Sequence, residues 1–471
     1  MKKNWILVLC TTACAAVCSV SLAACEKHTH SYTEEITAPT CTEQGYTTHT
    51  CSCGHNYVDT YVKALGHKFV TYTSNNNATL EQNCTETSIC AYDGCNETHT
   101  REIAGTMLDA GLYFTVNGGM ITGLTAYAKE NCPELTIPSK INGVKITSIK
   151  ESAFSGCSNL TSITIPNGVT SIGDWAFSGC SSLTSVVIGN GVASIKGNTF
   201  VGCSSLANIT LPDSVTRIGT TRDYGNSAFY NTAYYNDQNN WEEGGLYIGK
   251  HLITVNKATT GAFTIKEGTL TIADIAFMSC SSLTSITIPD SVTSIGNSAF
   301  YYCSSLTSVV IPDSVTSIGN SAFYYCSNLT SVVIGNGVAS IKGNTFVGCS
   351  SLANITLPDS VTSIGEYAFR GCSNLTSITI PDSVTSIGEY AFYYCSNLTS
   401  VVIPDSVTSI GNSAFYYCSS LTIYCEVASK PSGWSSWWND SDRPVYWYRE
   451  NQPTTMGNYW HYGENSEIVV W

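Results

Sequence analysis

The sequence is poor in charged residues. Asp, Glu, Lys and Arg make up only 12% of its 471 residues, and the formal net charge at pH 7 is −14. Binding to nucleic-acid phosphates requires a basic surface, so this composition predicts no nucleic-acid partner. Ser, Thr, Gly and Tyr are plentiful instead, which predicts a hydroxyl-rich and weakly charged surface.

Motifs of catalysis are also missing. The sequence contains no G-x-S-x-G, no phosphate-binding loop and no H-E-x-x-H, and residues 104–425 include a single histidine, His251. A catalytic pocket needs unlike groups that converge at one place. We therefore expect a protein that is not an enzyme.

One unit of 23 residues recurs through most of the chain. Residues 280–302 read C-S-S-L-T-S-I-T-I-P-D-S-V-T-S-I-G-N-S-A-F-Y-Y, and cysteine recurs every 23 residues from Cys280 to Cys418. A period of this length indicates a solenoid. Counting one phenylalanine per unit predicts eleven coils, at Phe154, Phe177, Phe200, Phe229, Phe277, Phe300, Phe323, Phe346, Phe369, Phe392 and Phe415.

A single unit cannot fold alone. Ile286 and Ile288 share one face of a short strand, and Pro289 followed by Asp290 ends that strand in a turn. About eight apolar side chains per coil contribute about 2 kcal/mol each when buried, which does not offset ordering the whole coil at about 1 kcal/mol or more per residue. Neighbouring coils must therefore share their stability by stacking.

The pattern L-x-x-I-x-I-P-x-x-V-x-x-I-G-x-x-A-F-x-x-C resembles the leucine-rich repeats of BspA-like bacterial surface proteins, over about residues 107–425. The resemblance implies a leucine-rich-repeat solenoid that is mainly β with irregular or short helical turns. It also implies a non-catalytic surface protein of the adhesin or recognition type.

The N-terminus has the features of a bacterial lipoprotein signal. A charged M-K-K start precedes an apolar run over residues 5–22, as in a secretory signal peptide. The L-A-A-C sequence that ends at Cys25 resembles a lipobox, which implies that residues 1–24 are removed and that Cys25 is acylated. Acyl chains would anchor the protein at the extracellular face of the bacterial cell membrane.

Residues 25–103 form a Cys/His-rich segment of two related halves, which we interpret as a β-rich stalk. Cys41, Cys51 and Cys53, with either His55 or His67, would supply the four ligands of a structural zinc. The spacing C-x9-C-x-C is not the paired C-x2-C arrangement of well-known zinc sites. Disulfides, or neither metal nor disulfide, are therefore open alternatives, and no other cofactor is expected.

The remaining chain is expected to form the solenoid with its two caps. Residues 104–151 would cap the first coil, residues 152–425 would form the array, and residues 426–471 would close it. The step from Phe229 to Phe277 is 48 residues instead of 23, which predicts a hairpin inserted near residues 233–262. Six of the nine tryptophans lie in the last segment, where they cover the final coil or form a platform for sugar or peptide.

Four coils carry a pair of tyrosines after the phenylalanine. Tyrosine offers a broad contact area at low entropic cost, so these pairs are the predicted binding surface, with packing of the coil corners as the alternative. The eight residues are Tyr301, Tyr302, Tyr324, Tyr325, Tyr393, Tyr394, Tyr416 and Tyr417. The cysteines in register are expected to be buried thiols, and the aspartates after proline to form turns in preference to calcium sites.

These features together predict a lipid-anchored surface protein that binds host or bacterial surface proteins or glycans through its solenoid. The first alternative is a glycan-capture lipoprotein that uses the Trp-rich tail and keeps the coils as a spacer. The second is a structural envelope protein without a soluble ligand.

Overall fold

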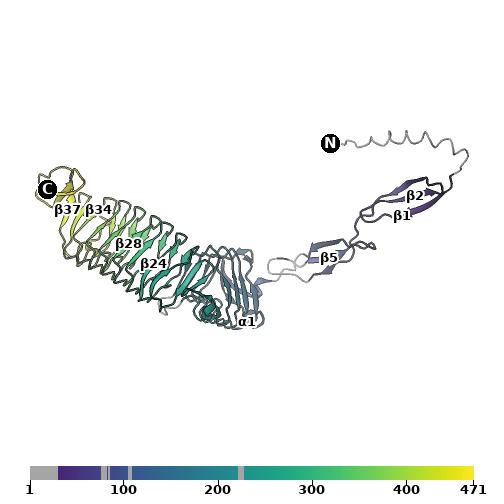
Figure 1. Ribbon diagram of the computed structural model, residues 1–471, viewed down its shortest axis with the longest axis horizontal. Helices are drawn as coiled ribbons and strands as arrows, with labels where there is room; N and C mark the ends of the chain where they lie inside the picture. The colour runs from purple at the N-terminus through teal and green to yellow at the C-terminus, as the bar shows by residue number, and fades with distance from the viewer. Residues whose placement is uncertain (1–29, 76–81, 83–84, 104–108, 221–226) are drawn as a thin grey trace. The chain divides into compact units, whose positions relative to one another are not determined.

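The computed structural model describes residues 30–75, 82, 85–103, 109–220 and 227–471, so the expected signal peptide and Cys25 lie outside the described residues. The chain divides into two compact units, Met1–Leu108 and Asp109–Trp471 (Figure 1). Within the part described, no helix combines the length and the apolar character that a membrane crossing requires.

The first unit contains two small antiparallel sheets of three strands each. The strands of the first sheet are β1 (Tyr32–Thr37), β2 (Gly45–Cys51) and β3 (Asn56–Val62), and those of the second are β4 (Thr73–Ser74), β5 (Thr85–Ile89) and β6 (Thr98–Glu102). Each sheet keeps its strands in chain order, so the unit consists of two consecutive β-meanders.

The second unit is a β-solenoid of about 13 turns, which confirms the predicted repeat fold. The eleven phenylalanine coils account for most of them, and turns after Phe415 supply the rest. Each turn adds one longer strand to a column of parallel strands. That column contains β9 (Glu134–Thr136), β13 (Ser162–Ile165), β15 (Ser185–Ile188) and β17 (Asn208–Thr210), then β22 (Gly261–Thr264), β24 (Leu283–Thr287), β26 (Ser308–Ile311), β28 (Ser331–Ile334), β30 (Asn354–Thr356), β32 (Ser377–Thr379), β34 (Ser400–Ile403) and β36 (Thr422–Cys425).

A second column, called the S-I column here, contains one two-residue strand per coil, which is Ser-Ile in all coils except Arg217–Ile218 and Thr271–Ile272. Neighbouring coils approach each other closely next to this column. A Cβ at Gly296 would lie only 2.3 Å from the backbone nitrogen of Asp274 in the preceding coil. The strands are β12 (Ser148–Ile149), β14 (Ser171–Ile172), β16 (Ser194–Ile195), β18 (Arg217–Ile218), β23 (Thr271–Ile272), β25 (Ser294–Ile295), β27 (Ser317–Ile318), β29 (Ser340–Ile341), β31 (Ser363–Ile364), β33 (Ser386–Ile387) and β35 (Ser409–Ile410).

Stacked phenylalanines run through the centre of the solenoid. Phe300 and Phe323 are fully buried, and their rings lie parallel with centroids 5.0 Å apart. Because the strands pair in register, identical slots face each other from coil to coil: Val309 pairs with Val332, and Ile311 with Ile334. The apolar faces that one coil leaves open are thus covered by the next coil.

A column of buried thiols accompanies the phenylalanines. The Cys303 Sγ donates to the Phe277 carbonyl at 3.1 Å, and the Cys326 Sγ donates to the Phe300 carbonyl at 3.2 Å. The cysteines of this column are thiols without disulfides. Burial raises the pKa of both of these thiols, so they stay protonated in the folded protein at neutral pH.

Serine and threonine hydroxyls connect the coils along their edges. The Ser314 hydroxyl donates to the Val292 carbonyl at 2.7 Å, and the Thr316 hydroxyl donates to the Thr293 carbonyl at 3.2 Å. The same bonds recur in later coils. Many hydroxyls that the composition assigns to the surface therefore stabilise the stack itself.

The array is interrupted by an inserted segment between the coils of Phe229 and Phe277. It contains α2 (Ala233–Asn236), η2 (Gln238–Asn240), β19 (Trp241–Glu242), β20 (Gly245–Ile248) and β21 (His251–Val255). β20 and β21 form an antiparallel hairpin, and β21 then pairs in parallel with β23. The inserted chain thus re-enters the S-I column, and the 23-residue period resumes.

Both ends of the solenoid are covered. At the start lie η1 (Ala110–Leu112), α1 (Ala126–Asn131), the hairpin of β7 (Phe114–Asn117) with β8 (Met120–Leu124), and the hairpin of β10 (Lys140–Ile141) with β11 (Val144–Lys145). At the end, β37 (Val445–Tyr448), β38 (Tyr459–Tyr462) and β39 (Ile468–Val470) extend the long-strand sheet.

Candidate binding surface

The second tyrosine of each pair occupies a left-handed backbone position. This slot lies two residues after the phenylalanine, and its φ is positive in all eleven coils. Five coils place glycine there, as expected where a Cβ is disfavoured. Four coils place a tyrosine there, at φ values of 59°, 56°, 61° and 59° for Tyr302, Tyr325, Tyr394 and Tyr417.

The tyrosines form two stacked groups at the surface. Tyr302, Tyr325, Tyr394 and Tyr417 are 42–48% exposed, whereas the first member of each pair is half-buried. The rings of Tyr301 and Tyr324 lie parallel at 4.6 Å, and those of Tyr394 and Tyr417 are stacked at 4.5 Å. Stacking fixes the orientation of each ring before any ligand arrives.

Two coils without paired tyrosines separate these groups. One carries Gly348, where a Cβ would lie 3.1 Å from the ring atoms of Tyr325. The other carries Arg370, whose guanidinium lies 5.4 Å from the ring centroids of both Tyr367 and Tyr393. We call the eight tyrosines together with Arg370 the tyrosine surface.

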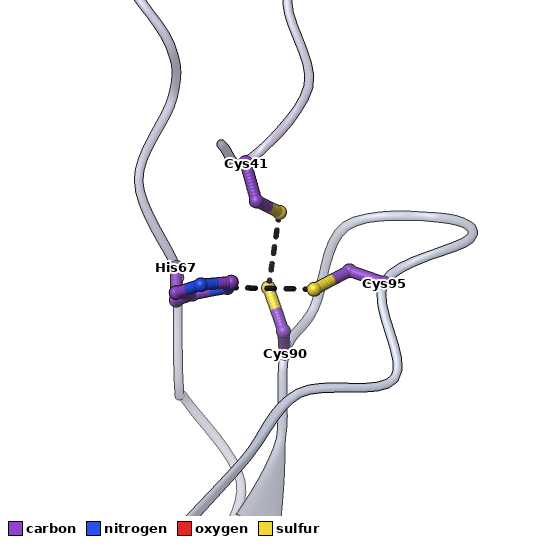
Figure 2. A group of neighbouring side chains, drawn as sticks. All are labelled: Cys41, His67, Cys90 and Cys95. Atoms are coloured by element: carbon purple, nitrogen blue, oxygen red, sulfur yellow. Dashed lines mark hydrogen bonds between the residues drawn. The ribbon is translucent and has the colours of Figure 1, made fainter. Parts of the chain in front are cut away.

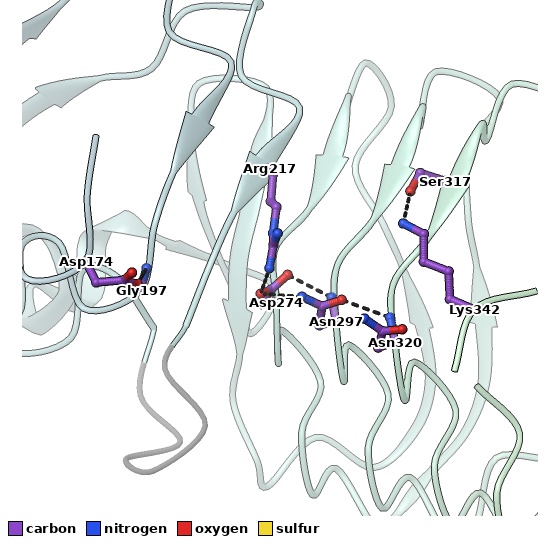
Figure 3. Close-up of polar contacts among 8 residues, drawn as sticks. All are labelled: Asp174, Gly197, Arg217, Asp274, Asn297, Ser317, Asn320 and Lys342. Carbon is purple, nitrogen blue, oxygen red and sulfur yellow. Dashed lines mark hydrogen bonds and ion pairs between the residues drawn. The ribbon is translucent and has the colours of Figure 1, made fainter. Parts of the chain in front are cut away.

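A polar cavity of about 560 Å³ adjoins the first tyrosine group, and its lining includes Tyr301, Tyr324, Arg217, Asp274, Asn297 and Asn320. Figure 3 shows four of these lining residues, Arg217, Asp274, Asn297 and Asn320, with their polar contacts. The described lining of the cavity includes no histidine or cysteine and only one carboxylate. It therefore offers hydrogen bonds, aromatic faces and one cation.

Asp274 organises this cavity from a buried position. Its carboxylate accepts hydrogen bonds from the Asn297 backbone N–H at 2.7 Å and from the Asn297 amide at 3.1 Å, and Arg217 approaches it at 3.5 Å. Burial raises the pKa of Asp274 despite these partners. The Asn297 side chain accepts from the Asn320 N–H in turn, so these groups continue a structural ladder (Figure 3).

The expected zinc ligands belong to two different groups. Cys41 and His67 lie with Cys90 and Cys95, as Figure 2 shows, whereas Cys51 and Cys53 lie with His30. The expected set of Cys41, Cys51, Cys53 and His67 therefore does not come together. His55 instead hydrogen-bonds the Tyr32 hydroxyl through Nδ1 at 2.9 Å.

The thiols in the first of these groups have opposite pKa shifts. Burial, with hydrogen bonds to Cys95 and Cys90, raises the pKa of Cys41 to about 12. Burial also acts to raise the pKa of Cys90, but hydrogen bonds from the N–H groups of Lys68 and Tyr92, and from His67 and Cys41, lower it to about 6.

The tryptophans of the C-terminal segment are mostly turned inward. Trp434, Trp438 and Trp460 are buried, and the Trp434 indole donates to the Val407 carbonyl at 2.9 Å. Trp437 is 66% exposed. Most of the aromatic area in this segment therefore covers the last coils, and Trp437 is its main exposed ring.

Sequence reasoning did not find several of these residues. The Arg217 guanidinium and the Asn297 amide both contact Asp274. Arg217 precedes the insertion and lies 57 residues before Asp274 in the sequence. Cys90 and Cys95 were not included in the expected zinc set with Cys41. Five other coils carry glycine at the position equivalent to Tyr302. This was the sequence feature that could have indicated a left-handed backbone there.

Stacked parallel coils with columns of buried phenylalanine and thiol side chains define a repeat solenoid of the leucine-rich class. The chain belongs to the family whose model is described as the BspA type leucine rich repeat region, which matches residues 122–240, 254–356 and 339–426. A comparison with curated proteins gives no match.

Several solved structures of leucine-rich repeat proteins resemble the chain. A leucine-rich repeat protein from Bacteroides ovatus is 27% identical, with 71% of this chain and 97% of that chain covered and a TM-score of 0.34. A leucine-rich repeat protein from Eubacterium ventriosum is 25% identical, with 68% and 92% covered and a TM-score of 0.36. A leucine rich cell surface protein from Faecalibacterium prausnitzii is 28% identical, with 69% and 95% covered and a TM-score of 0.25.

Proposed function

We propose that this protein is a non-catalytic, lipid-anchored recognition or adhesion protein that binds host or neighbouring-cell macromolecules through the tyrosine surface. The observation that carries the proposal is the use of tyrosine in four left-handed slots where five other coils use glycine. Backbone strain at exposed residues is a feature of binding sites.

Packing alone does not account for these four tyrosines. A left-handed conformation costs a residue with a Cβ about 1–2 kcal/mol, while a stacked aromatic pair contributes about 0.5–1.5 kcal/mol. The two effects nearly cancel, so tyrosine stabilises the coil little more than glycine would. A role in contacting a ligand explains why the exposed rings are present.

The character of the surface indicates an extended, weakly charged ligand. Two stacked tyrosine groups flank Arg370, and the polar cavity at Asp274 adjoins the first group. Oriented aromatic rings beside amides and a guanidinium suit a polypeptide segment or a glycan chain. Host or bacterial surface proteins and glycans are the partners that we propose.

Replacing the four strained tyrosines with glycine tests whether they serve ligand binding or the stability of the solenoid. The variant Tyr302→Gly, Tyr325→Gly, Tyr394→Gly, Tyr417→Gly is expected to lose at least about tenfold in affinity, because truncating even one tyrosine that anchors a contact costs about 2 kcal/mol or more. Its melting temperature should change little, since lost stacking and relieved strain offset each other. Arrays of mucins, extracellular-matrix proteins and glycans identify a bound component, whose affinity is then measured for each variant.

The matched control for this experiment is Trp437→Ala, which removes an exposed ring outside the tyrosine surface. It should leave the affinity unchanged. Loss of glycan binding in Trp437→Ala, with binding retained in the glycine variant, would reject the proposal and support glycan capture by the C-terminal segment.

We propose Cys25 as the attachment point of the lipid anchor. The variant Cys25→Ser removes the thiol that the acyl chains would modify, and each buried CH₂ of such a chain contributes about 0.8 kcal/mol to membrane binding. Expressed in a bacterium with its signal segment, the variant is expected to move from the detergent-rich to the aqueous phase in detergent partitioning. Equal partitioning of parent and variant would contradict an anchor at Cys25.

A further inference from the structure

The first unit has almost no apolar core. Within its described residues, 30–75, 82 and 85–103, the buried apolar residues are Cys51 and Cys90 alone. Larger apolar side chains are exposed, including Ile36 at 77% and Ile89 at 62%. Domains this small that lack a core usually depend on a metal or on disulfides.

Cys41, His67, Cys90 and Cys95 converge in this unit (Figure 2), and their ligand atoms all lie within 4.8 Å of one another. The Cys41 and Cys90 sulfurs are 3.6 Å apart, and the Cys95 sulfur is 3.4 Å from the His67 Nδ1. Three sulfurs and one imidazole nitrogen are the donor set of a tetrahedral structural zinc site.

Backbone hydrogen bonds hold the segments that carry these side chains. Cys41 follows β1, His67 follows β3, and Cys90 and Cys95 lie between β5 and β6. The Gly66 N–H donates to the Cys41 carbonyl at 3.1 Å, and the Ala91 N–H donates to the Lys68 carbonyl at 2.8 Å. The Lys68 N–H also points at the Cys90 sulfur at 3.4 Å, the kind of outer contact that orients a metal ligand.

We propose that Cys41, His67, Cys90 and Cys95 bind one zinc ion that joins the two sheets of the first unit. On binding, each of the three thiols releases its proton to solvent, and its sulfur and the neutral imidazole coordinate the metal. One disulfide would use only two of the three thiols and would leave the third beside His67. A metal ion uses all four converging donors.

The internal repeat of the unit supports the same assignment. His30, Cys51 and Cys53 form a similar group in the first half, with the His30 Nδ1 3.2 Å from the Cys53 sulfur. The second half supplies the matching trio of His67, Cys90 and Cys95. Cys41, contributed by the first half, adds the fourth donor, so this site links the halves.

The test measures zinc in the chain that lacks only residues 1–24, purified under reducing, zinc-replete conditions. Metal analysis by mass spectrometry should show that Cys90→Ser and Cys95→Ser each lose one zinc per chain relative to the parent. Cys132→Ser changes another partly exposed thiol and should lose none. Replacement of zinc by Co²⁺ should give the visible bands of a tetrahedral thiolate site, which Cys41→Ser and Cys90→Ser should abolish.

A zinc content in Cys90→Ser equal to that of the parent would overturn the proposal. A disulfide between Cys41 and Cys90 in zinc-replete parent protein, found by peptide mapping, would overturn it as well. The melting temperature of the solenoid is expected to be unchanged in these variants, and binding at the tyrosine surface should persist. Failure of the zinc proposal is therefore distinguishable from failure of the proposed function.

Discussion

Raising the pH from about 9 to about 10 is expected to unfold the solenoid cooperatively. Nine thiols of the coils have a pKa raised above the ordinary value, mainly by burial, and in Cys180 first by its hydrogen bond with Cys203. In the unfolded chain these thiols ionise near their ordinary pKa of about 8.5. The folded state keeps them protonated, so its stability falls once the pH exceeds that value.

The size of the effect follows from the number of thiols. Each group whose folded pKa lies higher reduces the free energy of unfolding by about 1.4 kcal/mol per pH unit above its unfolded pKa. Nine such groups give a slope of about 12 kcal/mol per pH unit, comparable to the whole stability of many domains. Tyrosines ionise near pH 10, and burial raises the pKa of several in the solenoid, so they add to the slope and the cysteine variants isolate the share of the thiols.

Tryptophan fluorescence is the measurement, because every tryptophan after Trp5 lies in the solenoid unit. Denaturant titrations at several pH values give the slope of the free energy of unfolding with pH. The triple variant Cys303→Ala, Cys326→Ala, Cys349→Ala should reduce this slope by about 4 kcal/mol per pH unit. An unchanged slope would contradict the assignment of alkaline sensitivity to the thiol column.

The repeat fold was predictable because its determinants are local and recur at one period. Each coil buries the same slots, so the spacing of Phe300, Phe323 and Phe346 already contains the column that the structure shows. Eleven coils were expected from these slots, and the structure has about 13 turns. The difference lies at the C-terminal end, where turns after Phe415 that lack the phenylalanine still add the strands β36 and β37.

The metal-ligand group could not be predicted from spacing. Reasoning within one half of the stalk favoured Cys41 with Cys51 and Cys53, because these cysteines are close in sequence. The structure brings Cys41 to Cys90, which is 49 residues away, through a backbone contact that no sequence pattern encodes. When the two halves of the stalk are aligned, Leu80 occupies the position of Cys41. Cys41 therefore has no matching cysteine in the second half, which was the sequence feature that could have indicated a contact between the halves.

The tyrosine surface stays a prediction as a binding site, and the structure adds backbone strain that the sequence did not show. The paired tyrosines were visible in the sequence, whereas a positive φ at Tyr302 and Tyr394 is a property of the folded coil. The cavity at Asp274 was not predicted, since Arg217 reaches it from the far side of the insertion. The 23-residue period predicts only contacts that recur in each coil, and the contact between Arg217 and Asp274 is specific to one place in the stack.

Deleting one whole period is expected to leave a folded solenoid, while deleting half a period is expected to destroy it. Removal of residues 349–371 joins Gly348 to Cys372 and brings Phe346 against Phe392. Each buried position of one coil then again faces the equivalent position of the next coil. Stability in a stack is a sum of coil and interface contributions, and this deletion removes one of each. The free energy of unfolding should change by only a few kcal/mol.

Removal of residues 349–360 instead places strand residues opposite turn residues. About eight apolar side chains then lose their cover, at about 2 kcal/mol for each side chain. A loss on the order of 15 kcal/mol exceeds what most domains can sustain. Circular dichroism during heating should show one cooperative transition for the 23-residue deletion and none for the 12-residue deletion. Equal unfolding of both variants would mean that coils are not interchangeable and that the stack depends on particular neighbours more than on its period.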